Sequence, residues 1–189
     1  MSTATATAAT PTVIPAGNWV VDASHSQFGF SVKHMGIANV RGEFKEFEGQ
    51  LEVPGDGLAG ATLVGKVAVA SVYTAEDKRD EHLRTSDFFA ADEFPEMSFR
   101  STQIEVLDDQ SFRVTGELTL REVTNEIVFH ADVQGTDLDP WGKERVGVEI
   151  TGLLSRSDYG MTFNQALGSG NMLVGDKVKL AIDISAVKA

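Results

Sequence analysis

Four histidines, at positions 25, 34, 82 and 130, are the first residues to test for chemistry. Metal sites often draw ligands from closely spaced pairs such as HxH or HExxH, and the chain contains neither pattern. There is no cysteine, so thiolate nucleophiles and cysteine-bound metals are excluded. The sequence therefore predicts no metal site and no cofactor.

His34 has the same strand parity as Phe28 and Phe30, which places it at the rim of an apolar face. There it could be a hydrogen-bonded structural residue, or it could touch the polar end of a ligand. The enzymatic alternative uses His34 or His82 as acid or base on a bound amphiphile, with a nearby carboxylate orienting the ring.

The segment DASHS brings together Asp22, Ser24 and His25, the residue types of a hydrolase triad. Neighbours along an extended chain point in different directions, and the strained GxSxG turn of such enzymes is missing. Phosphate loops and dinucleotide fingerprints are also missing. The motifs therefore favour a binding protein over a hydrolase.

The charge balance is strongly acidic. Asp and Glu number 28 against 16 Lys and Arg, a net charge of -12 that repels phosphate backbones. We expect no nucleic-acid partner.

The first 17 residues are rich in Ser, Thr and Ala and contain no Lys or Arg. We expect a disordered tail over residues 1–17 and one folded domain over residues 18–189. Without a charged opening or an apolar run, the start of the chain does not resemble a secretion signal, and no later stretch could cross a bilayer. This predicts a cytoplasmic protein that is not embedded in a membrane.

Apolar residues recur with a period of two along most of the chain, as in SFRVTGELTL and DKVKLAIDISAV. About eight to ten such segments predict an all-β, antiparallel fold. Glycines inside these segments favour a barrel of about eight strands over a sandwich, because closing strands need sharp coiling and bulges. A change of parity between Phe44 and Phe47 predicts a bulge or tight turn there.

Two segments break the strand pattern. Residues 75–84 predict a short helix capped by Thr74 and Asp77, with an ion pair between Asp80 and Arg84. MTFNQALGSG could form one or two further helical turns. The first helix could be a salt-bridged surface element, or it could plug the barrel with the two phenylalanines that follow it.

Five ordered segments, HSQFGFSVKH, VRGEFKEFEG, RDEHLRTSDFF followed by FPEMSFRST, GELTLREVT and SRSDYGM, resemble the YceI-like family of polyisoprenoid-binding proteins. The resemblance extends from about Trp19 to Val187. Glu122 departs from the glycine that the family often has in this turn. The resemblance implies a lipocalin-like barrel whose elongated cavity holds a long isoprenoid or similar amphiphile, for carriage or storage, and a possible homodimer.

Apolar contacts alone could bind such a ligand tightly, because burying some 20 methylenes yields on the order of 16 kcal/mol of gross binding free energy. We therefore expect selectivity to follow chain length and cavity shape. The alternative is a barrel filled by its own side chains. The candidate lining or capping residues are Phe28, Phe30, His34, Phe44, Phe88, Phe89, Phe99, Phe112, Met161, Phe163 and Met172.

Overall fold

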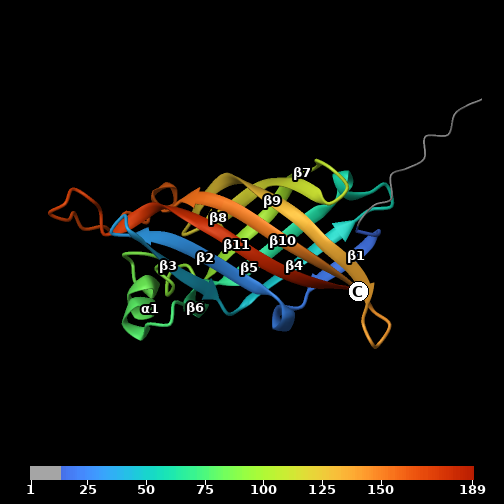
Figure 1. Ribbon diagram of the computed structural model, residues 1–189, viewed down its shortest axis with the longest axis horizontal. Helices are drawn as coiled ribbons and strands as arrows, with labels where there is room; N and C mark the ends of the chain where they lie inside the picture. The colour runs from blue at the N-terminus through green and yellow to red at the C-terminus, as the bar shows by residue number, and fades with distance from the viewer. Residues whose placement is uncertain (1–13) are drawn as a thin grey trace, which may run out of the picture.

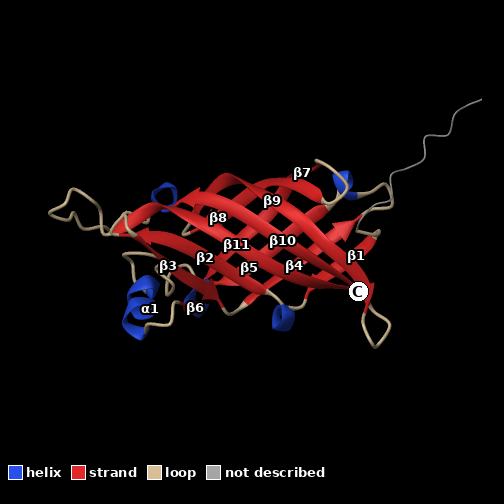
Figure 2. Ribbon diagram, viewed as in Figure 1, coloured by secondary structure: helices blue, strands red, loops and turns tan. Residues whose placement is uncertain are grey.

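A computed structural model of the chain describes residues 14–189, and nearly all of its regular structure is antiparallel strand (Figures 1 and 2). The single α-helix among these residues is α1 (Asp77–Arg84). Short 3-10 turns cover Ala23–His25, Leu58–Gly60, Val69–Ser71 and Arg156–Tyr159. The strands are β1 (Gly17–Val21), β2 (Gln27–His34), β3 (Ala38–Phe44), β4 (Phe47–Val53), β5 (Thr62–Ala68), β6 (Val72–Tyr73), β7 (Glu96–Val106), β8 (Ser111–Leu120), β9 (Val123–Leu138), β10 (Glu144–Ser155) and β11 (Val174–Lys188).

The strands close into a barrel. Their order in the sheet is β1-β4-β5-β7-β8-β9-β10-β11-β2-β3-β6, and β1 pairs with β11 as well as with β4. The ring β1-β4-β5-β7-β8-β9-β10-β11 therefore returns to its first member after eight strands. The predicted antiparallel barrel of about eight strands is confirmed.

One end of the barrel is built differently from the other. Strand β11 is long enough to have two partners on one side: its last residues pair with β1, and its residues 174–183 pair with β2. Strand β2 continues to β3 and then to the short β6, beside which α1 lies (Figure 1). Residues Lys45 and Glu46 separate β3 from β4, so the predicted irregularity between Phe44 and Phe47 is a break between two strands.

Helix α1 begins two residues later than predicted. Its N-cap is Glu76, whose side chain accepts a hydrogen bond from the Lys78 amide. Thr74, predicted as a cap, instead donates from its amide and its hydroxyl to the Asp80 carboxylate. This carboxylate is buried, so it fixes the helix to the segment before it.

The predicted ion pair between Asp80 and Arg84 is wrong. Arg84 donates from Nε to the Ala70 carbonyl at 2.8 Å and from a terminal nitrogen to the Val72 carbonyl at 3.1 Å. The Asp80 carboxylate and the Arg84 guanidinium therefore each bond to β6 or to the residues beside it, and they form no bond with each other.

The second segment with helical potential contains no helix. Residues 162–173 form an irregular loop closed by an isolated bridge between Ala166 and Met172. Glycines at positions 168 and 170 lie inside this loop, and Gly170 has a φ of 87° that other residues rarely adopt.

Residues 1–13 of the predicted tail lie outside the described residues. Ile14, which the prediction included in the tail, is buried against the core. The indole nitrogen of Trp19 donates to the Pro15 carbonyl at 3.0 Å. Among residues 14–189, no helix has the length and apolar character needed to cross a membrane.

Candidate functional site

A cavity of about 170 Å³ occupies the part of the barrel enclosed by the eight-strand ring. Its wall comes from the inward-facing positions of the strands, which alternate with outward polar residues as period two requires. We call this space cavity 1. The lining includes Trp19, Phe28, Phe47, Leu51, Leu63, Met97, Phe99, Ile104, Phe112, Val114, Leu118, Phe129, Val146, Val148, Ile150, Leu180, Ile182 and Ile184.

A second cavity of about 90 Å³ lies toward the α1 end of the barrel, and we call it cavity 2. Met97 and Leu180 line both cavities, so the two spaces adjoin each other. The lining consists of Phe30, Val32, Phe44, Leu83, Phe88, Phe89, Met97, Leu120, Leu154, Arg156, Met161, Val174, Val178 and Leu180.

Aromatic rings lie near the boundary between the two cavities. Phe44 is buried and is in contact with Phe28, Phe30 and Phe89, at ring-centroid distances of 5.7, 5.5 and 5.5 Å. Beside these rings, Met97 contributes an unbranched thioether side chain that can change rotamer more readily than a ring can move. A chain that filled both cavities would pass this constriction.

Aromatic rings also cover glycines on the barrel wall. A Cβ at Gly116 would lie 2.4 Å from the Phe99 ring, and one at Gly152 would lie 2.6 Å from the Phe129 ring. The two rings form an edge-to-face pair with centroids 5.2 Å apart. They therefore lie along the wall, in space that the glycines leave open, and do not fill the barrel axis.

Gly49 and Gly65 form a cross-strand pair that no aromatic ring covers. They are directly opposite each other on β4 and β5, and both line cavity 1. A Cβ at Gly65 would meet only the Glu48 carbonyl oxygen, at an ordinary 3.6 Å. The missing side chain at Gly65 contributes directly to the empty volume, whereas a Cβ at Gly49 would lie 3.0 Å from a Val21 methyl group.

The walls of both cavities are almost entirely apolar. Two cations, Lys66 and Arg156, are among the lining residues. The Lys66 ammonium lies outside, 3.4 Å from the Glu96 carboxylate, and the Arg156 guanidinium donates to the carbonyls of Gly175, Met161 and Val174. Burial lowers the pKa of Arg156. Its three backbone bonds hold the charged end in the protein, so its alkyl part faces the apolar space.

Helix α1 and the residues after it cover cavity 2. Leu83, Phe88 and Phe89 reach the cavity from this side. The His82 ring contacts Phe88 and Phe163 edge to face, at 5.1 and 4.9 Å, and its Nε2 lies 2.8 Å from the Asp87 carboxylate.

The histidine at position 25 belongs to an exposed cluster, outside the barrel. The Asp22 carboxylate and the Ser24 hydroxyl both lie near its Nδ1, at 2.9 and 3.0 Å. A triad would need the carboxylate and the hydroxyl at different ring nitrogens. The 3-10 turn thus brings the DASHS residues together, but in a cap and not in a catalytic arrangement.

Hydrogen bonds from Ser24, Arg145 and His25 hold the pKa of the Asp22 carboxyl well below its ordinary value. Arg145 contacts Asp22 at 2.8 Å and Asp139 at 3.1 Å. The cluster therefore connects the turn after β1 to the start of β10 and to the hairpin before it. Within residues 14–189, no three His, Asp or Glu side chains gather so as to hold a metal ion.

Most of the predicted contact residues line one of the two cavities. Phe28, Phe99 and Phe112 line cavity 1. Cavity 2 is lined by Phe30, Phe44, Phe88, Phe89 and Met161.

The remaining three candidates line neither cavity. His34 ends β2 and pairs with Val174, and Met172 is 46% exposed in the loop before β11. Phe163 packs on the outer side of Phe88, at a centroid distance of 5.4 Å.

Reasoning from the sequence missed the aliphatic majority of the lining, together with Met97 and Arg156. The same period-two signal would have found Val114 and Leu118, which share a strand face with Phe112, and Met97, which shares one with Phe99. It could not have found Ile104, because a bulge between Ser101 and Gln103 changes the parity of β7. No such signal exists for Arg156, which follows β10 and turns inward at the start of a 3-10 turn.

Comparisons with known proteins agree with this geometry. A UPF0312 protein of Staphylococcus aureus is 32% identical over 163 residues, which are 86% of this chain and 92% of that protein. The structure of a Campylobacter jejuni YCEI protein matches with a TM-score of 0.71 and 31% identity, covering 83% of this chain and 90% of that one.

A polyisoprenoid binding domain from Saccharophagus degradans has the same fold, with a TM-score of 0.67 at 17% identity, covering 90% of this chain and 98% of that one. The YceI-like domain matches residues 19–186, which include every strand that lines the two cavities except the first residues of β1 and the last of β11. The chain therefore belongs to the YceI-like domain family.

Proposed function

We propose that this protein binds a long-chain polyisoprenoid, or an amphiphilic lipid of similar length, inside the barrel and carries or stores it. The observation that carries the proposal is the pair of adjoining apolar cavities along the interior of a closed barrel. Apolar cavities of this kind stay dry and accept apolar guests. The polyisoprenoid binding domain of S. degradans, which has the same fold, supports the same class of ligand.

The available space accepts a substantial part of such a chain. An apolar cavity of about 150 Å³ accepts one benzene ring, so cavities of about 170 and 90 Å³ hold on the order of ten carbons. Ten buried methylenes yield about 8 kcal/mol gross, which corresponds to a Kd of about 1 μM before the costs of association. We infer that the rest of a longer chain extends beyond the two cavities.

The polar head of such a ligand has no charged partner within the cavities. The guanidinium of Arg156 is bonded to backbone carbonyls, and Arg79 and Arg84 bond to the chain before α1. We therefore infer that the head lies outside the apolar walls and that the hydrocarbon chain determines affinity.

We infer a binding role and not a catalytic one. His34 and His82, the proposed acid or base of the enzymatic alternative, line neither cavity. Their rings are therefore not in contact with the space that would hold the substrate.

Location and assembly are separate proposals. We propose that the protein works in the cytoplasm, where its lack of cysteine suits a reducing environment without requiring one. A homodimer is proposed from the family resemblance alone. Cell fractionation and sedimentation velocity test these two points.

The binding proposal is tested by titrating prenyl alcohols of increasing length and then comparing an alcohol with a phosphate of equal length. Affinity should rise with length until the cavities are full, and the change of head should alter Kd by less than about tenfold. Affinity that followed the head group and ignored chain length would contradict the proposal.

A further inference from the structure

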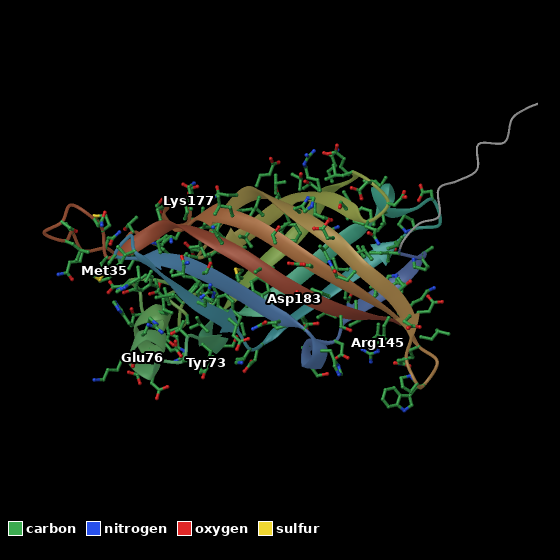
Figure 3. The ribbon with its side chains drawn as sticks, viewed as in Figure 1. Met35, Tyr73, Glu76, Arg145, Lys177 and Asp183 are labelled. Carbon is green, nitrogen blue, oxygen red and sulfur yellow. The ribbon has the colours of Figure 1, made fainter. Side chains whose placement is uncertain are left out.

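Two segments meet at the α1 end of the barrel and project beyond it along the long axis (Figures 1 and 3). They are residues 35–38, which form the β2–β3 turn and the first residue of β3, and the loop of residues 164–173. The Met35 amide donates to the Leu173 carbonyl at 2.9 Å, and the Asn171 side chain donates to the Met35 carbonyl at 3.1 Å. We call the two segments together the tip.

The tip is uncharged and exposes apolar side chains, which lie beside the polar residues Asn164, Gln165, Ser169 and Asn171. Ile37 is 76% exposed, and Met35 and Met172 are exposed beside it. In a protein with 23% charged residues, there is no charged side chain from Tyr159 to Gly175 or from Met35 to Val40. Such a surface is poorly solvated and favours contact with an apolar phase.

Basic residues surround the tip on the outer face of the barrel. They form the collar, which we define as Lys33, Arg41, Lys177 and Lys179. Cross-strand pairing joins Ser31 on one side to Arg41 and on the other to Lys179, so these two cations lie on the same face of the sheet with β2 between them. Within residues 14–189, no collar residue forms an ion pair.

The tip lies next to residues that line cavity 2. Val32 and Val174, which line that cavity, lie a few residues from Met35 and Met172 along β2 and β11. Asn164 holds Val174 through both its backbone groups, at 2.8 and 3.0 Å. The two thioether side chains of the tip can repack around a passing chain.

We propose that the tip docks on the surface of a lipid bilayer, with the apolar side chains inserted and the collar facing anionic head groups. A protruding patch of exposed apolar side chains, bounded by cations that form no ion pair within the described residues, suits a membrane interface, although the molecule as a whole is acidic. The Lys177 ammonium donates to the Ser155 hydroxyl and keeps its charge. The proposal rests on the proposed function, because docking there places cavity 2 beside the hydrocarbon from which its ligand would come.

The test is flotation with vesicles of phosphatidylcholine alone and of phosphatidylcholine mixed with phosphatidylglycerol. The double variant Ile37→Asp with Met172→Asp should lower vesicle binding by about tenfold or more, because two inserted apolar side chains are lost. The matched control is Leu138→Asp with Trp141→Asp, which adds the same charge at exposed apolar positions of the opposite end, 63% and 82% exposed.

The control should bind vesicles as the unaltered protein does. The collar variant Lys33→Gln with Lys179→Gln should weaken binding to the mixed vesicles more than binding to phosphatidylcholine alone. Equal loss in the tip and control variants, or no vesicle binding by the unaltered protein, would overturn the proposal. So would a tip variant that lost self-association in sedimentation while keeping its vesicle binding.

A parallel titration with a soluble short prenyl alcohol separates the two proposals. The tip variant should keep its affinity for this ligand, because the cavity walls are unchanged. Vesicle binding without any prenyl binding would leave the docking surface standing and would count against the proposed function.

Discussion

Single glycines control how much of the barrel stays empty. Where Gly116 and Gly152 lie on the wall, aromatic rings occupy the freed space. At Gly65 nothing occupies it, and the opposite residue on β4 is Gly49. The volume available to a ligand therefore depends on the absence of a side chain at this position.

Gly65→Val should stabilise the protein and weaken its binding. The new side chain fits the strand and fills empty space, which should raise the free energy of unfolding by about 1 kcal/mol. Displacing ligand atoms of similar volume should cost about 2 kcal/mol, or about thirtyfold in Kd. Urea unfolding and prenyl alcohol titration measure the two effects.

Gly147→Val is the matched control. Gly147 lies between Val146 and Val148, which line cavity 1, so its own Cβ would point to the outer face, where it would meet Gln134 at 3.6 Å. Binding by this variant should equal that of the unaltered protein. If both variants bound the ligand normally, cavity 1 could not be the binding space.

The Asp22 cluster makes a second prediction about a single residue. Because the pKa of Asp22 is lower in the folded than in the unfolded chain, its stabilisation is present above its ordinary pKa of 3.8 and is lost as the pH falls toward the folded pKa. Asp22→Asn should lower the free energy of unfolding by about 1 kcal/mol at neutral pH. Urea titrations should show this difference shrinking well below pH 3.8; an unchanged difference would refute the assignment.

Among the elements, α1 acts as the cover of cavity 2. It has eight residues, too few to be stable by itself, so its position depends on contacts with the barrel. Arg84 supplies two of them through the carbonyls of Ala70 and Val72. We expect these bonds to set how often the cover opens.

Arg84→Ala should loosen α1 and speed the release of ligand several-fold, with a loss of about 1 kcal/mol in the free energy of unfolding. Hydrogen exchange should increase over residues 77–84 before it increases in β8. Lys78→Ala is the control on the same helix, since within the described residues its ammonium donates no hydrogen bond. Ligand release at the original rate from the Arg84 variant would show that α1 is not the cover.

The elements also show where sequence patterns succeed. Period two identified the strands and their inward faces, because burial in a closed sheet imposes strict alternation. It could not show that α1 would bond through Thr74 and Arg84 to the chain before it, since those contacts depend on tertiary proximity. For the same reason residues 161–170, which were expected to form one or two helical turns, contain no helix.

In the molecule as a whole, most charged residues lie on the surface and the empty volume lies in an apolar interior. The barrel surface is acidic, the interior is apolar, and the exposed apolar tip with its basic collar lies at one end. Alternation predicted the inward face but not whether this face was filled, because emptiness depends on how rings lie over distant glycines. The structure resolves this question in favour of two adjoining cavities.

A chain held by apolar contacts should bind with little dependence on salt, because the cations of the wall are already bonded, Arg156 to backbone carbonyls and Lys66 to Glu96. Titration of a prenyl phosphate at low and high ionic strength should give Kd values within about threefold of each other. A steep loss of affinity with salt would instead indicate that an ion pair holds the head group.

The most direct measurement of the central claim is mass spectrometry of the lipid extracted from protein purified from its own cells without detergent. We predict one long-chain isoprenoid or similar amphiphile in near-equimolar amount, and its loss from native spectra of the Gly65→Val variant. Native spectra showing only the bare polypeptide, before and after incubation with prenyl lipids, would contradict the claim that the barrel is a lipid-binding site.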